Sequence, residues 1–386
     1  MEILGGTIVT PYRILKNWVV LTEGGLIQKI GKDLDHSRGE DKIDASGKLV
    51  LPGFIDVHVH GGGGKDTMDA TYDALNTISM AHAKGGTTSI VPATVSAPLG
   101  QIVKAIEAVK YAKEKGTSGA NVLGIHLEGP YLSAAQKGAQ DERYIRSVSL
   151  EELVELSKYA RTIKAISAAP EVDGVLGLAR EMSSKGILMS IAHSDATIYQ
   201  VEEALEAGFS HVTHLYSGNS FVKRINAFRY PGVVEAAYLF GELSVDIIAD
   251  GKHLPPYLIK LIIKNKGINA VNVITDAMRA AGMPPGNYKL GDQDVIVDQG
   301  VAWLPDRSAF AGSVSTMNVM AKVLAEDVGL SMQDVARMTS TNGASLLGLR
   351  NKGVLSEGKD ADIVILNKDF SVFMTIVGGE VVYKTG

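Results

Sequence analysis

The middle of the chain repeats one pattern of apolar and polar positions. A short apolar run is followed by a turn of polar residues or glycine, and then by a stretch with the apolar spacing of an amphipathic helix. Eight such runs lie at residues 54–60, 88–91, 122–128, 165–169, 187–193, 211–215, 245–249 and 271–276. Strands that alternate with helices in this way predict an α/β fold, a (β/α)8 barrel of the TIM type.

A doubly wound open sheet is the alternative for the same alternation. That fold normally carries a glycine-rich nucleotide-binding turn after its first strand. The four glycines at 61–64 are the nearest candidate, but no helix with a phosphate-binding Lys-Ser/Thr pair follows them directly. We therefore favour the barrel and interpret residues 61–64 as a flexible loop.

Local signals mark the ends of several expected helices. Ser149 with Glu152, and Thr197 with Gln200, have the spacing of a capping box. Glycines stand where the preceding helices should stop, at Gly116, Gly186 and Gly208.

Both ends of the chain have a different character, with short strands and tight turns. Residues 18–21 and 26–30 flank a glycine turn, and residues 373–377 and 380–383 flank Gly378 and Gly379. Because neither end is long enough to bury a core alone, we expect both to fold together into one small β-sandwich. The predicted domains are therefore 1–51 with 353–386 for the sandwich, and 52–352 for the barrel.

Composition narrows the class of protein. The 386 residues include 38 Lys and Arg and 43 Asp and Glu, for a net charge of −5, which argues against a nucleic-acid or anionic-membrane partner. The absence of cysteine excludes disulfides, thiolate metal sites and a thiol nucleophile. The chain start lacks the pattern of a secretion signal, and no apolar run reaches the roughly 18 residues of a membrane span. We expect a soluble, cytoplasmic protein.

Ionisable side chains gather where the predicted strands end, and in a barrel these ends carry the active site. The first strand ends in a His-x-His pair whose members face the same side, since strand side chains alternate. The residues at or just after these ends are His58, His60, His126, Glu128, His193, His214, Asp250, His253 and Asp276. Chance placement of so many at strand ends is improbable.

Nitrogen and carboxylate ligands without thiolates suit an open catalytic site for a divalent metal. Zinc is the first choice, and iron, manganese and cobalt are alternatives. Such a metal lowers the pKa of a bound water towards ~7. Asp276 could take the proton of that water and return it to a leaving group, which predicts hydrolysis of an unreactive carbonyl.

The remaining histidines have simpler interpretations. His126 lies two residues before Glu128 on the same face, and we favour support of the ligands over direct ligation. His82 lies in a helical pattern and His36 in a polar loop, so both are expected to be structural or solvated. His211 begins a strand and is expected to pack.

Several motifs together resemble the amidohydrolase superfamily, and within it the N-acetylglucosamine-6-phosphate deacetylase group. The resemblance runs along the whole chain. The motifs are PGFIDVHVH at 52–60, GGTT at 85–88, HLEGP at 126–130, AHS at 192–194, THLY at 213–216, ADGKH at 249–253, TDA at 275–277, AGS at 311–313 and GKDAD at 358–362. The closing GKDAD is shared by many amidohydrolases, whereas the combination of the others is specific to the deacetylase group.

The resemblance implies a metal held by Glu128, His193 and His214. Members that keep the first-strand histidines can bind a second metal, so His58 and His60 make one or two ions possible, with Glu128 as a bridge. It also implies that Asp276 is the general base and then the acid that protonates the departing amine. His253 would hydrogen-bond the substrate and polarise the acetyl carbonyl. Related enzymes place a carboxylated lysine after strand four; here AAPE at 168–171 has none, which disfavours dihydroorotase-like and urease-like activities.

The substrate-binding segments depart from the family pattern at one point. The family follows its His-Leu-Tyr/Phe motif with Asn-Ala-Met, and this chain has Ser-Gly-Asn-Ser at 217–220, so Gly218 or Asn219 would substitute. Arg229 matches a family arginine that reaches a phosphate, in some members across a dimer interface, and Arg224 lies nearby. Gln140 stands where the family contacts the sugar.

The prediction from these residues is an enzyme that hydrolyses the acetamide of N-acetylglucosamine 6-phosphate to glucosamine 6-phosphate and acetate. Its expected partners are this small-molecule substrate and a second copy of the chain in a homodimer. One alternative is the same mechanism on N-acetylgalactosamine 6-phosphate or a non-phosphorylated N-acyl compound. The other is an inactive scaffold or binding protein, which predicts a broken ligand set.

Overall fold

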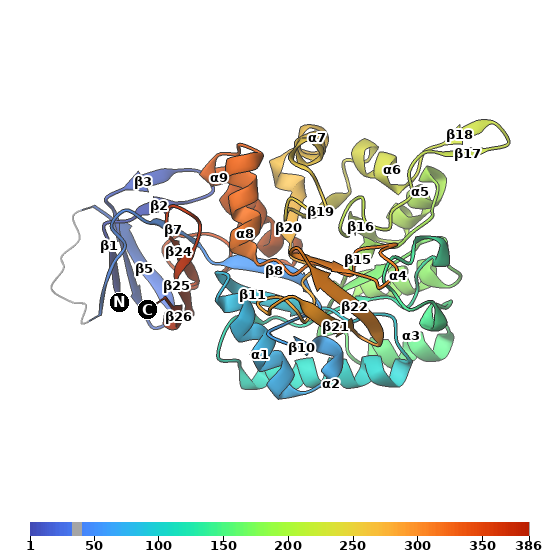
Figure 1. The fold of residues 1–386 in the computed structure, drawn as a ribbon, viewed down its shortest axis with the longest axis horizontal. Helices are drawn as coiled ribbons and strands as arrows, with labels where there is room; N and C mark the ends of the chain where they lie inside the picture. The colour runs from blue at the N-terminus through green and yellow to red at the C-terminus, as the bar shows by residue number, and fades with distance from the viewer. Residues whose placement is uncertain (33–40, 386) are drawn as a thin grey trace.

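The computed structural model describes residues 1–32 and 41–385. One end of the molecule consists of β-strands and holds both termini, and the larger part is an α/β barrel (Figure 1). His36, for which the sequence predicted a structural or solvated role, lies outside the described residues.

Eight parallel strands form a closed ring in chain order, which is a TIM-like arrangement. The strands are β8 (Phe54–Val59), β11 (Thr87–Pro92), β13 (Ile125–Glu128), β14 (Ile163–Ala168), β15 (Leu188–Ile191), β16 (Phe209–Val212), β19 (Ser244–Ile248) and β20 (Val271–Ile274). Strands β13 to β20 form one continuous parallel sheet, and β8 and β11 pair beside it. Parallel bridges from Ala93 to His126 and from Val59 to Ala277 close the two remaining gaps.

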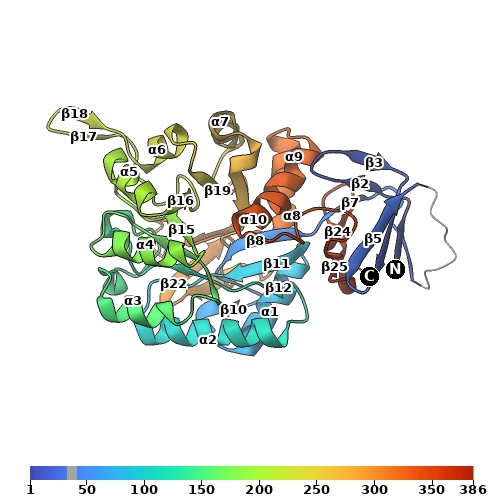
Figure 2. The ribbon, with the colours of Figure 1, turned by 180° about the vertical axis from the view of Figure 1, so that it is seen from behind.

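Helices follow the strands and cover the outside of the ring (Figures 1 and 2). The helices are α1 (Tyr72–Ala83), α2 (Leu99–Lys115), α3 (Leu150–Ser157), α4 (Val175–Ser184), α5 (Ile198–Glu206), α6 (Val233–Leu239), α7 (Pro256–Lys266), α8 (Met317–Lys322), α9 (Met332–Ala336) and α10 (Asn342–Leu346). Shorter helical turns are η1 (Thr67–Asp69), η2 (Ala134–Gln136), η3 (Glu142–Tyr144), η4 (Ile268–Ala270), η5 (Val323–Asp327) and η6 (Arg337–Thr341). The predicted capping boxes begin α3 and α5, and Gly116 ends α2.

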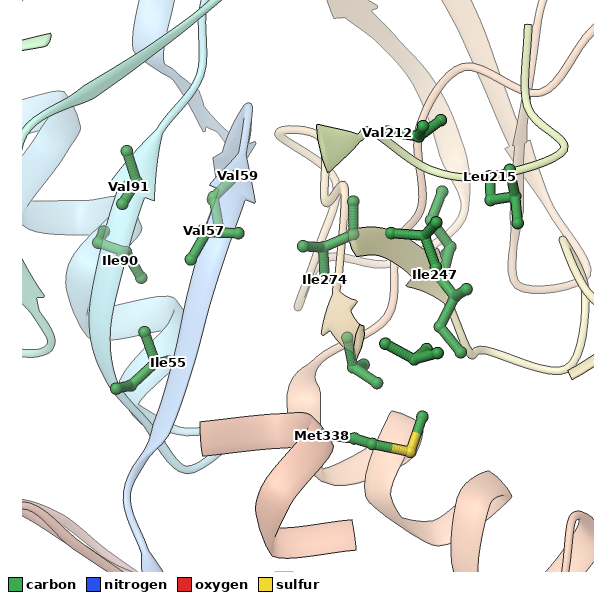
Figure 3. Packing of buried hydrophobic residues seen from close by; sticks show 14 of the residues in the cluster. Ile55, Val57, Val59, Ile90, Val91, Val212, Leu215, Ile247, Ile274 and Met338 are labelled. Atoms are coloured by element: carbon green, nitrogen blue, oxygen red, sulfur yellow. The ribbon is translucent and has the colours of Figure 1, made fainter. Parts of the chain in front are cut away.

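Along β8, apolar side chains that pack in the core alternate with polar side chains that face the interior of the barrel. Ile55, Val57 and Val59 belong to the large hydrophobic cluster that joins strands and helices (Figure 3). The residues between them are polar and also buried, and His58 is fully inaccessible to solvent. Because strand residues alternate between faces, the apolar set anchors the strand while the polar set lines the interior of the barrel.

Two sheets are formed by the ends of the chain, the first from N-terminal strands alone and the second from strands of both termini. Their strands are β1 (Glu2–Leu4), β2 (Thr7–Val9), β3 (Ile14–Lys16), β4 (Val19–Glu23), β5 (Leu26–Gly31), β6 (Lys42–Asp44), β7 (Leu49–Pro52), β24 (Ile363–Leu366), β25 (Val372–Val377) and β26 (Glu380–Lys384). One sheet has the order β5-β4-β1-β6 and the other β26-β25-β24-β7-β2-β3. A second hydrophobic cluster takes Ile3 and Val20 from the first sheet and Val50 and Ile363 from the other.

The structure differs from the sequence-based expectation in two segments. The glycines at 61–64 do not form an open loop, because β9 (Gly61–Gly62) pairs with β10 (Lys65–Asp66) and Gly63 and Gly64 turn between them with positive φ. The expected strand at 122–128 is divided at Gly124 into β12 (Asn121–Val122) and β13.

Two small antiparallel additions were not anticipated. A hairpin of β17 (Lys223–Ile225) and β18 (Phe228–Tyr230) projects from the barrel, at the end opposite the termini in both views (Figures 1 and 2). A three-stranded sheet of β21 (Gly286–Leu290), β22 (Gln293–Asp298) and β23 (Val301–Trp303) follows the last barrel strand. Within the described residues, no helix combines the length and apolarity that crossing a membrane requires.

Candidate metal centre and active site

The carboxylate of Glu128 lies among four imidazole rings at the carboxyl end of the barrel. Its Oε1 lies 2.8 Å from Nε2 of His214 and 3.3 Å from Nε2 of His193. Its Oε2 lies 3.2 Å from Nε2 of His60 and 3.7 Å from Nε2 of His58. Each carboxylate oxygen therefore serves one histidine pair, and each pair together with Glu128 could hold a metal ion.

Hydrogen bonds on the far side of two rings indicate which nitrogen is free for a metal. Nδ1 of His193 donates to the carbonyl of Gln136 at 2.8 Å, and Nδ1 of His214 donates to that of Ser217 at 3.0 Å. Nε2 of each ring then faces Glu128, where it donates a hydrogen bond when the ring is protonated and offers a lone pair to a metal when the ring is neutral. These nitrogen and oxygen donors suit zinc, iron, manganese or cobalt.

The ionised carboxylates of the site also favour binding of a cation. Burial alone would raise the pKa of the Glu128 carboxyl, but the charge of His58 and the hydrogen bonds of His193 and His214 hold it well below its usual range. Burial opposes a charge on His60, yet hydrogen bonds to Asp276 and Glu128 raise its pKa well above the ordinary value. The buried carboxylates of Glu128 and Asp276 therefore stay ionised and attract positive charge.

Three residues at the strand ends adopt left-handed backbone conformations, with φ of 45° at His193, 33° at His214 and 49° at Asp276. Such conformations are costly for residues with a Cβ and persist where the surroundings hold them in place. A Cβ at Gly218 would stand 2.6 Å from Nδ1 of His193, so the chain can pass this close only as glycine.

Asp276 directly faces the first-strand pair. Its Oδ1 lies 3.1 Å from Nε2 of His60 and 3.5 Å from Nε2 of His58. Burial works to raise its pKa, but the hydrogen bond of His60 and the charge of His58 lower it to about 2. Its backbone is fixed by bonds from its N–H to the carbonyl of His58 and from the N–H of Ser313 to its own carbonyl. Asp276 is therefore an ionised, well-placed proton acceptor.

His253 lies on the wall of the same cavity. Its Nδ1 is 2.9 Å from Oδ2 of Asp250, and its ring meets the edge of Phe310 at 4.8 Å between centroids. The cavity is lined by His60, Glu128, Gly138, Ala139, Gln140, His193, His214, Ser217, Gly218, His253, Asp276, Leu290, Ala309, Phe310 and Gly312. Metal-binding groups, a carboxylate base and a histidine thus share one opening.

Gln140 lies beside the metal ligands as well as on the cavity wall. Its amide Nε2 donates to Oε2 of Glu128 at 2.7 Å, and its Oε1 accepts from the backbone N–H of Ser96 at 2.7 Å. The side chain is buried between these partners. The sequence predicted a sugar contact here, and the structure adds a direct bond to Glu128.

The other described histidines do not belong to the two ligand clusters, although the ring of His126 lies 4.5 Å from that of His58 between centroids. Nδ1 of His126 donates to the carbonyl of Val57, and its Nε2 is 2.7 Å from Oγ of Ser167, so both nitrogens are occupied. Burial, with the charge of His58, lowers its pKa to about 3. His211 pairs with buried Asp246. His82 donates to the carbonyl of Gly61 and holds the glycine hairpin, a role its helical pattern did not indicate.

The predicted substrate-binding residues fall into two groups. Gly218 lines the cavity, and buried Asn219 behind it accepts the N–H of Tyr216. Arg224 and Arg229 are exposed on the β17–β18 hairpin and do not line the cavity of their own chain.

The sequence placed Asp250 after the seventh strand without indicating a role for it, and it gave no indication of Phe310 as part of the site. Asp250 stands three residues before His253, a spacing that could have suggested a hydrogen-bonded pair. Phe310 gives no local signal, because it reaches the cavity through the sheet β21–β23, where Trp303 bridges to it.

Comparison with known proteins agrees with this geometry. Residues 49–382 match the model of the amidohydrolase family. The chain is 37% identical to an N-acetylglucosamine-6-phosphate deacetylase of Bacillus subtilis, covering 97% of this chain and 95% of the relative. It is 33% identical to an N-acetylgalactosamine-6-phosphate deacetylase of Escherichia coli O157:H7, covering 86% and 87%.

A solved structure has the same architecture throughout. It is a mutant of N-acetyl-D-glucosamine-6-phosphate deacetylase from Mycobacterium smegmatis in complex with N-acetyl-D-glucosamine-6-phosphate, with a TM-score of 0.91 and 28% identity, covering 100% of this chain and 99% of the other. With the match of the family model over most of its length, the chain belongs to the amidohydrolase family.

Proposed function

We propose that this protein is a metal-dependent deacetylase that hydrolyses the acetamide of N-acetylglucosamine 6-phosphate to glucosamine 6-phosphate and acetate. The observation that carries the proposal is the complete set around Glu128, with two histidine pairs and Asp276 in one cavity. The relatives named for this activity, and the neighbour with this substrate bound, support the choice of substrate. An intact ligand set disfavours the inactive scaffold.

The metal is assigned to Glu128, His193 and His214, with a second ion at His58 and His60. Zinc is the proposed ion, and iron, manganese or cobalt fit the same donors. When bound, a divalent metal at such a site supplies a Lewis acid for the acetyl oxygen and lowers the pKa of the attacking water.

The protein's own residues supply the proton transfers. Asp276, ionised and within reach of the ligand cluster, takes the proton of the attacking water as the new C–O bond forms. The same carboxyl returns a proton to the sugar nitrogen as the C–N bond breaks, so that acetate and the amine leave. His253, which lines the same cavity, contacts the acetyl oxygen and stabilises the charge that develops on it.

The sugar phosphate is assigned to the mouth of the cavity. Gly218 and Gln140, which line the cavity, are proposed to contact it directly, and buried Asn219 is proposed to hold this segment through its bond to the N–H of Tyr216. Arg224 and Arg229 point to a homodimer, because they are exposed on a projecting hairpin whose apolar side chain Phe228 is 70% exposed. In a dimer this hairpin would bring its arginines to the phosphate of the neighbouring site.

We also propose that residues 1–51 and 353–386 form one small β-sandwich domain and that 52–352 form the barrel domain. The pairing of β7 with β24 and the hydrophobic cluster shared by the two terminal sheets support this division. The cytoplasmic location stays a prediction from the sequence.

Purified protein loaded with zinc should release acetate from N-acetylglucosamine 6-phosphate with a kcat/KM well above that for unphosphorylated N-acetylglucosamine. The galacto epimer is the second candidate, because segment 217–220 departs from the family pattern and one relative is named for that substrate. A kcat/KM at least as high for N-acetylgalactosamine 6-phosphate would overturn the first assignment.

A further inference from the structure

Asp250 is held in a fixed orientation by three hydrogen bonds. Its Oδ1 accepts the backbone N–H groups of Lys252 and His253, each at 2.8 Å. Its Oδ2 lies 2.9 Å from Nδ1 of His253. One carboxylate oxygen is thus committed to the backbone, and the other is left for the imidazole.

This arrangement determines where the ring carries its proton. Burial would raise the pKa of Asp250, but the hydrogen bonds and charge of His253 lower it, so the carboxylate is ionised and can only accept. Nδ1 of His253 must therefore donate. Phe310 packs against the ring, and turning the ring over would lose the bond to Asp250. Nε2 is the nitrogen left for the cavity.

We propose that Asp250 is a positioning residue that fixes His253 in its Nδ1–H form, so that Nε2 meets the acyl oxygen only as the N–H of an imidazolium. This inference rests on the proposed deacetylase function. A neutral ring of this form presents a bare lone pair, which repels a carbonyl oxygen. The imidazolium donates a charge-assisted bond that strengthens as the acyl oxygen becomes negative.

Ionisable groups lie on both sides of the His253 ring. The ionisable groups that line the same cavity are Glu128, Asp276, His60, His193 and His214. Asp250 supplies the counter-charge on the other side of the ring, and Phe310 adds no charge. The arrangement follows the logic of a carboxylate that orients a histidine in a catalytic triad.

The substitution Asp250→Asn separates the tautomer from the charge. The asparagine carbonyl oxygen keeps the two backbone N–H groups, so its NH2 group faces Nδ1, and the neutral ring is then protonated on Nε2. The variant still has a neutral N–H donor in the cavity but has lost the imidazolium. We expect kcat to fall about 100- to 1000-fold with a much smaller change in KM.

The tautomer is measured by NMR of protein with ¹⁵N-labelled histidine, and His253→Gln assigns the signal by difference. We expect the His253 ring to be protonated on Nδ1 in the wild type and on Nε2 in Asp250→Asn. The double variant Asp250→Asn/His253→Gln should have the same kcat as Asp250→Asn alone. Exposed Asp173→Asn is the matched control and should keep wild-type kcat.

A wild-type ring protonated on Nε2 alone would overturn the proposal, and so would an Asp250→Asn enzyme with kcat within threefold of wild type. If Asp250→Asn does not fold, the proposal is still tested by the protonated nitrogen in the wild-type spectrum and by the kcat of His253→Gln. Absence of acetate release by the wild type would reject the proposed function and leave the tautomer measurement valid.

Discussion

Replacing Gln140 by leucine tests how far the metal centre depends on a neighbour that does not belong to the ligand clusters. The substitution removes the 2.7 Å bond from Nε2 to Oε2 of Glu128, the oxygen that faces His58 and His60. A hydrogen bond to a charged group contributes about 1.5–3 kcal/mol. With tenfold in affinity for each 1.4 kcal/mol, the metal should bind roughly 10- to 150-fold more weakly.

The same substitution has a second, separate cost. The buried N–H of Ser96 loses its acceptor, the Oε1 of Gln140, and an unsatisfied buried donor costs about 1–3 kcal/mol. We therefore expect a lower free energy of unfolding for the metal-free protein too. The two effects can be told apart, because the weaker binding appears only when metal is added, whereas the lower free energy of unfolding is measured without metal.

The assay is calorimetric titration of zinc into metal-free protein, together with urea unfolding of that protein. Gln101→Leu, on an exposed position of α2, is the matched control and should leave both quantities unchanged. If Gln140→Leu bound zinc with wild-type affinity, the hydrogen bond to Glu128 would not be holding the ligand in place.

Three further changes have defined outcomes. Asp276→Asn should lower kcat by at least ~100-fold, measured as acetate release, because it removes the proton acceptor. Lys352→Met should lower the free energy of unfolding by about 3 kcal/mol in urea, because Asp362, 2.6 Å from the ammonium, is left buried without a counter-charge. Gly218→Ala should weaken zinc binding at least ~10-fold in the calorimeter, because a Cβ in a left-handed conformation costs about 1–2 kcal/mol and would press on His193.

Two of these changes have a matched control variant. Lys110→Met breaks an exposed pair on α2 and should cost at most about 1 kcal/mol, and an equal loss for both lysines would contradict the burial argument. A Cβ at Gly241 meets no neighbour within 4 Å, so Gly241→Ala is the control for Gly218→Ala and should bind zinc with wild-type affinity. Equal zinc affinities for the two variants would contradict the contact with His193. Asp276→Asn with near-wild-type kcat would remove Asp276 as the base.

The barrel and its strand ends could be predicted because their signals are local. Alternation in β8 put His58 and His60 on one face, and the polar ends of the other strands followed the same rule. The glycines at 61–64 misled because glycine alone does not distinguish a loop from a tight hairpin. What fixes this segment is distant in sequence, namely His82 and the carbonyl of Ala277.

The supporting contacts could not be predicted for the same reason. Nothing near Gln140 in the sequence indicates that it bonds Glu128, and only the family resemblance, not the local pattern, suggested that Arg229 could lie outside the cavity of its own chain. Such contacts depend on how loops of different strands meet. The β21–β23 sheet that presents Phe310 follows the eighth barrel strand and lies outside the repeating strand–helix pattern, so that pattern does not predict it.

The pairing of β7 with β24 has a consequence for how the protein is made. Residues 49–52 hydrogen-bond to residues 363–366, and β7 leads directly into the strand that carries His58 and His60. A nascent chain therefore cannot complete this sheet until nearly all of it has left the ribosome, and contacts of such sequence separation slow folding. Truncation before β24 should leave β7 without its partner strand and so loosen the segment that leads into His58 and His60.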